Sequence, residues 1–513
     1  MNDNTPILVG SGQYVDREPP SPETSLSPMD MAAEVARRAI DHAGARGDLA
    51  AHVDVLAVAR LFEHSVKDSV MWPNPYGCTN NVPWSVANRL GITPKRPIYA
   101  EVGGETPQRL VNQMSEAIHA GEVRAALLTG AEALATIRQG TRAGLEFDWN
   151  EEVEGDYEDL WPDATMASAH EVAHGITFPI NVYCLFEHAR RTELGLSLKE
   201  WKARIGKVFA PFSAVAAANP YAQFPVALDP EFIATPSKKN FPLCEPYNKW
   251  MVAQDQVNQG AAVVLTSVGL ARELGIPEEN WVFLRSYADV DDVHVTRRRA
   301  LSTSDAQGLA LNRALDDSGL NVDQIKHMDL YSCFPIAVTA ACEHMGIDPL
   351  SGRELTMTGG LPFFGGPGNN YSLHGIAEVV AQLRGKTDTH ALVAANGGYL
   401  SKHSCGIYSR QLDGPWQVRS STAEQAEAQR LGSVEVTQQP NGPATVESYA
   451  AVYARGEQSG GYIVGRLNAD NSRFLAAMAP GSDKARDLLF SPNPIGAPVI
   501  AIHNDGANTF DVA

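Results

Sequence analysis

Short apolar runs alternate along this chain with longer segments whose apolar residues recur every three or four positions. Residues 98–121 show the plan: an apolar run leads through a diglycine turn into a segment of helical spacing that stops at a glycine. We expect Thr106 to cap this helix and Pro107 to hold its first position. The turn then places Gly103 and Gly104 at a helix N-terminus, where free backbone N–H groups and a partial positive charge suit an oxyanion, a thiolate or a carbonyl oxygen.

The same plan returns in the second half of the chain. A strand expected over residues 325–334 is followed by a glycine turn and a helix within residues 358–385, and then by a strand at 390–395. Two copies of a β-α-β plan predict an α/β body made of two pseudo-symmetric halves.

The pattern divides the chain into four parts. We assign residues 1–134 and 246–275 to an N-terminal half, and residues 276–412 to a C-terminal half. Residues 135–245 are less regular and are expected to form an inserted domain. Residues 413–513 change to short strands, which predicts a separate small β-rich domain resembling a barrel. Its expected strands are 433–437, 446–455, 461–467, 474–478 and 498–503, and its expected helix lies near 484–490.

Composition narrows the possible partners and location. The formal net charge of −19 disfavours nucleic acid and anionic membranes, since both are bound mainly by Lys and Arg. Six cysteines occur without a CxxC pair, so neither a disulfide framework nor a cysteine zinc site is indicated. The first residues lack a basic segment followed by an apolar run, and no apolar stretch is long enough to span a bilayer. We therefore expect a cytoplasmic protein with no nucleic-acid or membrane partner.

Five ordered segments carry a family resemblance. They are PYNKWMVAQDQVNQGAAVVLTS (246–267), NPYAQF (219–224), YSCF (331–334), the GGP turn (365–367) and the strand before NGG (396–398). Together they resemble the thiolase superfamily, in particular sterol-carrier-protein-type thiolases and the thiolase-like proteins of type 1 that carry an additional C-terminal domain. The resemblance implies a five-layer αβαβα body and an inserted loop domain that binds a CoA thioester. It also implies a relationship to acetyl-CoA acetyltransferases of lipid metabolism.

The same resemblance locates four catalytic positions, and none of them holds the family's usual side chain. The nucleophilic cysteine corresponds to Gly104 within one residue, and the catalytic histidine to Gly366. The second cysteine corresponds to Ala395, and the Asn or His that holds an oxyanion-hole water corresponds to Tyr331. Without a nucleophile, a base and an acid at the α-carbon, we expect no classical thiolysis or Claisen condensation. Backbone N–H groups at Gly104 and Gly397 could still polarise a thioester carbonyl.

Three side chains are candidates for remaining catalysis, each with a structural alternative. Tyr331 could act as an acid or base, although buried tyrosines more often serve as hydrogen-bonded core residues. His403 could reach a substrate, although a lone histidine is more often structural. Glu105 could be a base, or could only complement the helix dipole.

Further residues are expected to bind the substrate. They are Gly103, Gly104, Cys333, Asn369, Asn370, His374, Asn396, Gly397, Lys238, Lys239 and Lys249. Each has a structural alternative: Cys333 could be a buried structural thiol, the asparagines could form turns and cap a helix, and the lysines could be solvated at the surface. We predict no metal and no cofactor other than CoA or acyl-CoA as ligand, in a monomer or homodimer.

Two other functions compete with acyl-CoA binding. The first is a non-covalent carbon–carbon lyase that cleaves a β-hydroxyacyl-CoA by a retro-aldol reaction, for which a base and an oxyanion hole suffice. Thiolase-like aldolases work with an OB-fold partner, of which the C-terminal domain would be a fused analogue. The second is a zinc peptidase, because HEVAH (170–174) fits HExxH. Gly175 and Pro179 disfavour the long helix that such a site needs.

Overall fold

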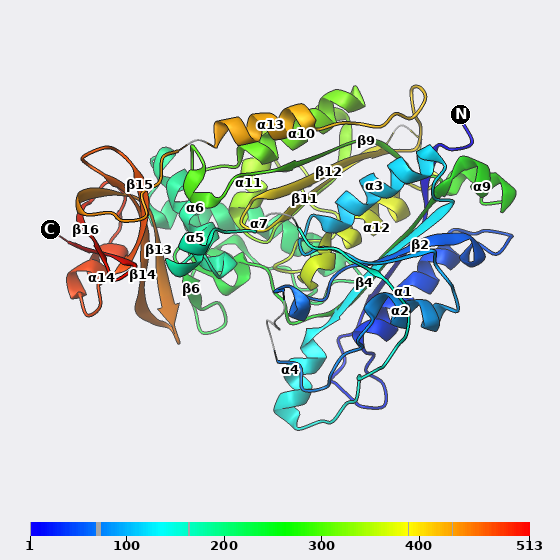
Figure 1. The fold of residues 1–513 in the computed structure, drawn as a ribbon, viewed down its shortest axis with the longest axis horizontal. Helices are drawn as coiled ribbons and strands as arrows, with labels where there is room; N and C mark the ends of the chain where they lie inside the picture. The colour runs from blue at the N-terminus through cyan, green and yellow to red at the C-terminus, as the bar shows by residue number, and fades with distance from the viewer. Residues whose placement is uncertain (1, 68–72, 163–164, 388, 433, 513) are drawn as a thin grey trace.

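The computed structural model describes residues 2–67, 73–162, 165–387, 389–432 and 434–512. The molecule is elongated, with two layered sheets in its larger part and a small β-rich unit at one end (Figure 1). No helix in these ranges is both long and apolar enough to cross a membrane.

The N-terminal half is built on a six-stranded sheet. Its strand order is β1 (Pro6–Val15), β8 (Asn258–Ser267), β4 (Ala125–Ala133), β2 (Val53–Val58), β3 (Arg96–Tyr99) and β5 (Glu158–Asp159). Strands β2, β3 and β4 run parallel, as the β-α-β plan requires, and β1 pairs antiparallel with β8. Helix α1 (Pro28–His42) buries Met31, Val35 and Ala39 against this sheet. The shorter helices of this half are α2 (Val82–Leu90) and α9 (Val268–Glu273).

The C-terminal half repeats this arrangement around a four-stranded sheet. Its strand order is β10 (Ile325–Leu330), β11 (His390–Gly397), β12 (Lys402–Ser409) and β9 (Phe283–Asp291). Helices α10 (Asp305–Ser318) and α11 (Pro335–His344) cover its outer side, and α13 (Thr422–Leu431) packs on α10.

The middle layer consists of one helix from each half. Helices α3 (Thr106–Ala120) and α12 (Tyr371–Leu383) lie side by side between the sheets (Figure 1). Met114 of α3 and Val380 of α12 belong to one apolar core with strands of both sheets. These layers confirm the αβαβα body. The helix α3 begins one residue earlier than expected, with Glu105 in the N-cap position, and Pro107 fits because N–H groups in a first turn need no helical partner.

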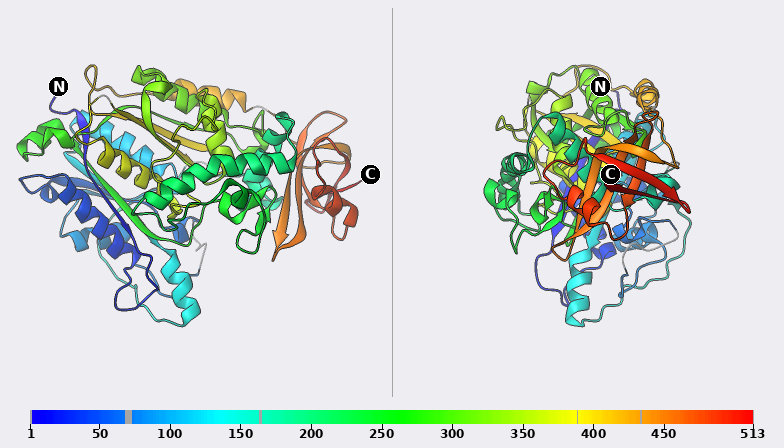
Figure 2. Two further views of the ribbon diagram at one scale, coloured as in Figure 1. Left: turned by 180° about the vertical axis from the view of Figure 1, so that it is seen from behind. Right: turned by 90° about the vertical axis from the view of Figure 1, so that its left-hand side faces the viewer.

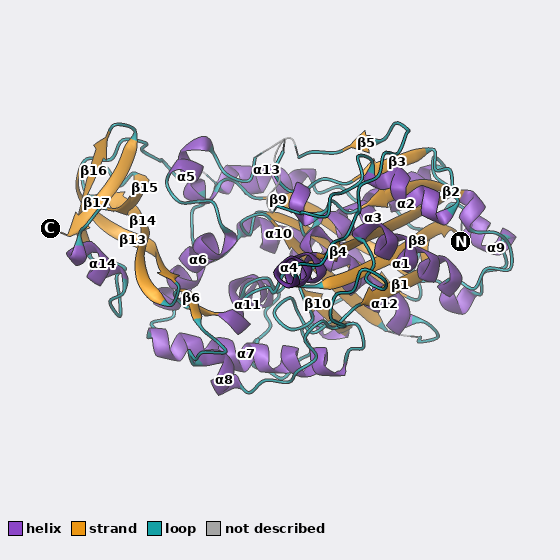
Figure 3. Ribbon diagram, turned by 90° about the horizontal axis from the view of Figure 1, so that it is seen from below, coloured by secondary structure: helices purple, strands orange, loops and turns teal. Residues whose placement is uncertain are grey.

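The segment between the halves is mainly helical. It contains α4 (Leu134–Ala143), α5 (Ala169–Ala173), α6 (Pro179–Glu193), α7 (Leu198–Ala218), α8 (Pro230–Ala234) and β6 (Pro242–Cys244), and β7 (Tyr247–Asn248) follows directly after it. The helices α7 and α8 run along one side of the molecule (Figure 3). Trp201 of α7 donates a hydrogen bond of 2.7 Å to Glu187 of α6, whose other oxygen accepts from the backbone N–H of Ile336. This buried carboxylate therefore ties the segment to the C-terminal half.

The C-terminal domain contains a closed five-stranded barrel. The strands follow one another as β13 (Gly442–Ala454), β14 (Glu457–Leu467), β15 (Arg473–Met478), β17 (Ala507–Val512) and β16 (Pro498–Asn504), and β16 pairs with β13. Helix α14 (Asp483–Leu489) packs against it. The barrel sits at one end of the molecule in the left view of Figure 2 and faces the viewer in the right view. The strand expected at 433–437 is wrong: residues 434–437 form only one isolated β-bridge, between Val436 and Arg473. Residue 433 lies outside the described residues.

Candidate active site

The diglycine turn lies where β3 ends and α3 begins, and residues of the other half hold it in place. Gly103 has a φ of +151°, a conformation that favours glycine. Its N–H donates a hydrogen bond of 3.0 Å to Oδ1 of Asn369, and the carbonyl oxygen of Gly104 accepts one of 2.7 Å from Ser372. The start of α12 therefore fixes the backbone geometry of the turn.

Tyr331 fills the space in front of Gly104. A Cβ atom built on Gly104 would overlap the Tyr331 hydroxyl and would lie 2.6 Å from the carbonyl oxygen of Asn396. The Tyr331 ring is buried edge-on against Tyr371. Burial, with smaller effects of Cys333 and Glu105, raises the pKa of Tyr331 well above its usual value, so the hydroxyl is protonated at neutral pH. A side chain at position 104 and the ring of Tyr331 cannot both occupy this space.

Glu105 turns its carboxylate back into the same region. A Cβ atom on Gly103 or on Gly397 would overlap this carboxylate, so it fills the gap between the two glycines. Glu105 is fully buried, and one oxygen lies 3.2 Å from Nζ of Lys402. Burial raises the pKa of Glu105, although Lys402 and Arg109 attract the charged form. A carboxyl group that holds its proton more tightly than usual thus lies beside the backbone of the turn.

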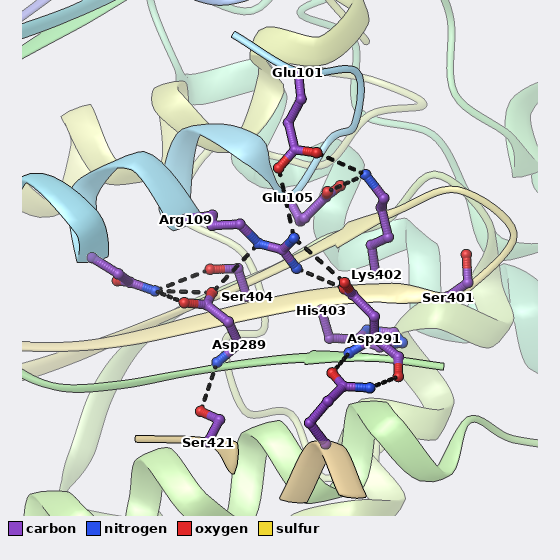
Figure 4. Close-up of polar contacts among 12 residues, drawn as sticks. Glu101, Glu105, Arg109, Asp289, Asp291, Ser401, Lys402, His403, Ser404 and Ser421 are labelled. Carbon is purple, nitrogen blue, oxygen red and sulfur yellow. Dashed lines mark hydrogen bonds and ion pairs between the residues drawn. The ribbon is translucent and has the colours of Figure 1, made fainter. Parts of the chain in front are cut away.

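Lys402 and Arg109 connect Glu105 to acidic groups nearer the surface (Figure 4). Nζ of Lys402 lies 3.5 Å from Glu101 and donates to the carbonyl oxygen of Val102 at 3.2 Å. Arg109 pairs with Asp291 at 2.6 Å. Burial opposes the charged form of Lys402, but Glu105 and Glu101 raise its pKa. Neither cation was expected from the sequence, although Arg109 stands four positions after Glu105 on one helix face.

Cys333 and Asn396 lie together with a tyrosine of the inserted segment. Nδ2 of Asn396 donates to the hydroxyl of Tyr183 at 2.9 Å and to Sγ of Cys333 at 3.6 Å. The Tyr183 hydroxyl also accepts from the N–H of Leu400. Burial raises the pKa of Cys333 to about 12, so its thiol is protonated and a poor nucleophile. Tyr183 carried no sequence signal, because it stands in a helix that the pattern did not predict.

The other two replaced positions are Gly366, which has no side chain, and Ala395, whose side chain is a methyl group. The N–H of Gly366 donates to the carbonyl oxygen of Gln254 at 2.8 Å, and a Cβ built on Gly366 would have no neighbour closer than 3.3 Å. Ala395 lies on β11, paired with Ser404 of β12. A Cβ atom at position 366 would therefore meet only a tight contact, whereas at position 104 it would overlap its neighbours.

Asn370 and His374 hold the two halves together. Nδ2 of Asn370 donates to the carbonyl oxygen of Gly130 at 2.7 Å. Nδ1 of His374 lies 2.8 Å from Oε1 of Gln13. Burial lowers the pKa of His374 to about 3, so its ring is neutral. Both contacts are with strands of the N-terminal half.

His403 points away from the turn. Neighbouring residues of a strand face opposite sides of a sheet, and on β12 Lys402 faces Glu105. His403 instead contacts Ser304, with Nε2 3.0 Å from its hydroxyl, and the carbonyl oxygen of Leu400. Burial, assisted by Arg298, lowers the pKa of His403 to about 3. The structure does not bring this histidine together with Tyr331 and Glu105.

Of the three lysines proposed for CoA, two lie in the inserted segment and the third lies just after it. Lys238 and Lys239 are exposed in the connection between α8 and β6, and Lys249 packs its Nζ 4.9 Å from the centre of the Trp250 ring. None of the three lysines belongs to the diglycine turn or to the helix that follows it.

The HEVAH motif is engaged in structural contacts. Helix α5 ends at Ala173, and Glu171 closes a capping box with Ser168 and accepts two bonds of 2.8 Å from Thr296. Nδ1 of His174 lies 2.8 Å from the carbonyl oxygen of His170, and Nε2 accepts from the N–H of Asn508. A zinc site here would have to break these contacts, which supports the structural interpretation.

Comparisons with known proteins agree with this architecture. Residues 425–507 match the family described as the thiolase-like protein type 1 additional C-terminal domain. The crystal structure of a monomeric SCP2-thiolase like protein type 1 from Mycobacterium smegmatis is 36 % identical, with 100 % of each chain covered and a TM-score of 0.85. No curated protein matches the chain.

Two more distant structures share the fold alone. The Ltp2-ChsH2(DUF35) aldolase is 20 % identical, covers 79 % of this chain and 98 % of its own, and has a TM-score of 0.56. Acat5 thiolase from Ascaris suum, solved in complex with coenzyme A, is 14 % identical over 79 % of this chain and 100 % of its own, with a TM-score of 0.55. The two halves and the glycine turn thus define a protein of the thiolase fold. The chain belongs to the SCP2-thiolase-like proteins of type 1.

Proposed function

We propose that this protein binds a CoA thioester at the diglycine turn and does not transfer acyl groups through a cysteine. The observation that carries the proposal is the position of Tyr331, whose hydroxyl occupies the space of a side chain at Gly104. The nearby thiol of Cys333 is protonated and bonded to Asn396. The turn keeps a helix N-terminus, which suits a thioester carbonyl oxygen without any side chain.

Calorimetric titration with CoA and with acyl-CoAs of increasing length tests the binding. We expect binding without thiolysis in a parallel assay. The proposal is contradicted if none of the CoA compounds binds. It is also contradicted if the wild type catalyses thiolysis and Cys333→Ala does not.

Rebuilding the family's nucleophile tests the role of Tyr331. Gly104→Cys with Gly366→His is expected to remain inactive in thiolysis, because the Tyr331 ring and the new thiol overlap. Adding Tyr331→Asn frees the space and is expected to raise thiolysis at least about tenfold above the double variant, since a general base alone contributes more than that. Thiolysis by the double variant at the rate of the triple variant would show that Tyr331 does not exclude a nucleophile.

A second candidate function is retro-aldol cleavage of a β-hydroxyacyl-CoA. It is favoured by the buried carboxyl of Glu105, which lies between Gly103 and Gly397 and beside Tyr331. The ionised carboxylate of Glu105 would take the proton of the β-hydroxyl group, and the Cα–Cβ bond would break to leave a carbonyl product. Backbone N–H groups would stabilise the enolate until Glu105 returns the proton to it, directly or through the hydroxyl of Tyr331. His403 is not available as the base, because it faces the other side of β12. Cleavage that survives in both Glu105→Gln and Tyr331→Phe would contradict this assignment.

The protein is expected to be a monomer. Strand β5 pairs with β3 and covers the edge of the N-terminal sheet, and Arg96 and Glu158 hold the pair with a salt bridge of 2.8 Å. The edge that remains is β5, a strand of two residues, and a very short edge strand disfavours pairing with a second copy. Light scattering coupled to gel filtration should give the mass of one chain at micromolar concentration, and a dimer mass would contradict the expectation.

We also propose a reducing, cytoplasmic location. The six cysteines are all free, including Cys184 and Cys244, whose sulfur atoms lie 3.5 Å apart without a bond.

A further inference from the structure

Three possible metal ligands meet in the loop that follows β2. They are Glu63 and His64, in the short 3-10 helix 62–64, and Cys78. The carboxylate oxygen, ring nitrogen and thiol sulfur all lie within 4.8 Å of one another. Within the described part of the chain, this is the one group of three or more such side chains close enough to hold an ion. The sequence did not indicate it, because the ligands have no spacing typical of a metal motif.

Two of the three side chains have a partner that orients them. Nδ1 of His64 lies 2.8 Å from the hydroxyl of Tyr99, which leaves Nε2 free to face Glu63 at 3.9 Å. Asn74 donates to Glu63 at 3.4 Å and to the carbonyl oxygen of Gly77, which closes the loop that carries Cys78. A histidine held through its second nitrogen is typical of metal sites.

A divalent cation would suit the chemistry of these side chains. Bound metal stabilises a carboxylate and a thiolate, and its binding displaces the protons of its ligands. The cation and the two anions would then leave the group with no net charge.

We propose that Glu63, His64 and Cys78 bind one zinc ion. Oxygen, nitrogen and sulfur ligands together suit Zn²⁺ rather than Mg²⁺ or Ca²⁺. Tetrahedral zinc ligands are about 3.3 to 3.8 Å apart, so the three side chains must draw together by about 1.5 Å at most. His64 also lines a cavity of about 410 Å³ with Thr79 and Tyr99, from which water or an anion could supply the fourth ligand.

The zinc would hold a segment that contacts the diglycine turn. Ser65, next to His64, accepts a hydrogen bond of 3.0 Å from Nδ2 of Asn369. Oδ1 of the same Asn369 accepts from the N–H of Gly103. The ion therefore acts as a structural clamp on the loop, and Ser65 and Asn369 connect His64 to the diglycine turn. The zinc proposal does not depend on the proposed function.

Metal analysis of the full chain, purified without chelator and without added metal, tests the site. We expect close to one zinc per wild-type chain and at least tenfold less in His64→Ala/Cys78→Ser. The matched control is His170→Ala, in the HEVAH motif, which should keep its zinc. Zinc that stays below a tenth of an equivalent in the wild type, even after incubation with Zn²⁺ and desalting, overturns the proposal. Retention by the double variant, or loss only in His170→Ala, also overturns it.

A measurement on the wild type avoids any folding defect of the variants. Alkylation of Cys78, followed by peptide mass spectrometry, is expected to be at least tenfold slower with bound zinc than after chelator treatment. Cys333, which lies outside the cluster, serves as the internal control and should react equally in both samples. Equal rates at Cys78 with and without chelator would overturn the proposal.

Discussion

Replacing Arg473 with methionine is expected to destabilise the contact between the barrel and the C-terminal half by about 3 kcal/mol, because it removes one of the two cations paired with Glu447 and the donor to two backbone carbonyl oxygens. Arg473 is fully buried and pairs with Glu447 through two bonds, of 2.5 and 2.8 Å. It also donates to the backbone carbonyl oxygens of Thr296 and Arg298, which lie outside the barrel. The measurement is urea unfolding followed by tryptophan fluorescence, in which the first transition should move to lower urea.

Arg466→Met is the matched control. Arg466 pairs with the same Glu447 at 2.7 Å, but 23 % of its side chain is exposed and its bonds stay within the barrel. We expect a loss of about 1 kcal/mol or less. Burial opposes ionisation of Glu447, yet Arg473 and Arg466 together lower its pKa. Stability from these pairs is thus complete above the unfolded-state pKa near 4.5 and is lost as pH falls through the lower, folded-state pKa. Equal losses in the two variants would show that burial of Arg473 is unimportant.

The layered body could be predicted because its signals are local. Glycines stop the helices, apolar residues recur at helical spacing, and buried strands read as unbroken apolar runs. Elements with weak local signals were missed. Helix α13 buries one residue, Ala428, so its pattern is mostly polar. Strand β5 consists of Glu158 and Asp159, two residues that carry no strand pattern and pair with β3 only through the tertiary fold.

Only the backbone part of the candidate site, the diglycine turn, could be predicted from the local sequence pattern. The diglycine turn is visible in the sequence, and the family resemblance places Tyr331 nearby. The contact between Tyr331 and Gly104 depends on how two distant segments pack. His403 and Lys402 differ by one position, and strand alternation sends one away from Glu105 and the other toward it. Adjacent residues cannot be told apart by the sequence motif alone, and the strand in the folded sheet shows which of them faces the site.

Replacing Lys402 with methionine is expected to make stability fall with rising pH. Nζ of Lys402 lies 3.2 Å from Glu105, which is fully buried, so without it the pKa of Glu105 should rise further. A carboxyl whose folded-state pKa is raised binds its proton more tightly when folded, so stability is lost as pH rises above the unfolded-state pKa near 4.5. We expect a loss of about 1 kcal/mol or less at pH 5 and about 3 kcal/mol at pH 8, measured by urea unfolding.

The double variant Glu105→Gln/Lys402→Met isolates this effect, because it removes the titrating group together with its partner. Its stability should differ from that of Glu105→Gln by the same amount at pH 5 and pH 8. Lys402 itself has a raised pKa in the folded protein, so its charge contributes fully at both pH values and is lost only in alkaline solution. An equal loss at the two pH values in Lys402→Met would mean that Glu105 keeps one protonation state between pH 5 and pH 8, which would contradict the expected further rise of its pKa.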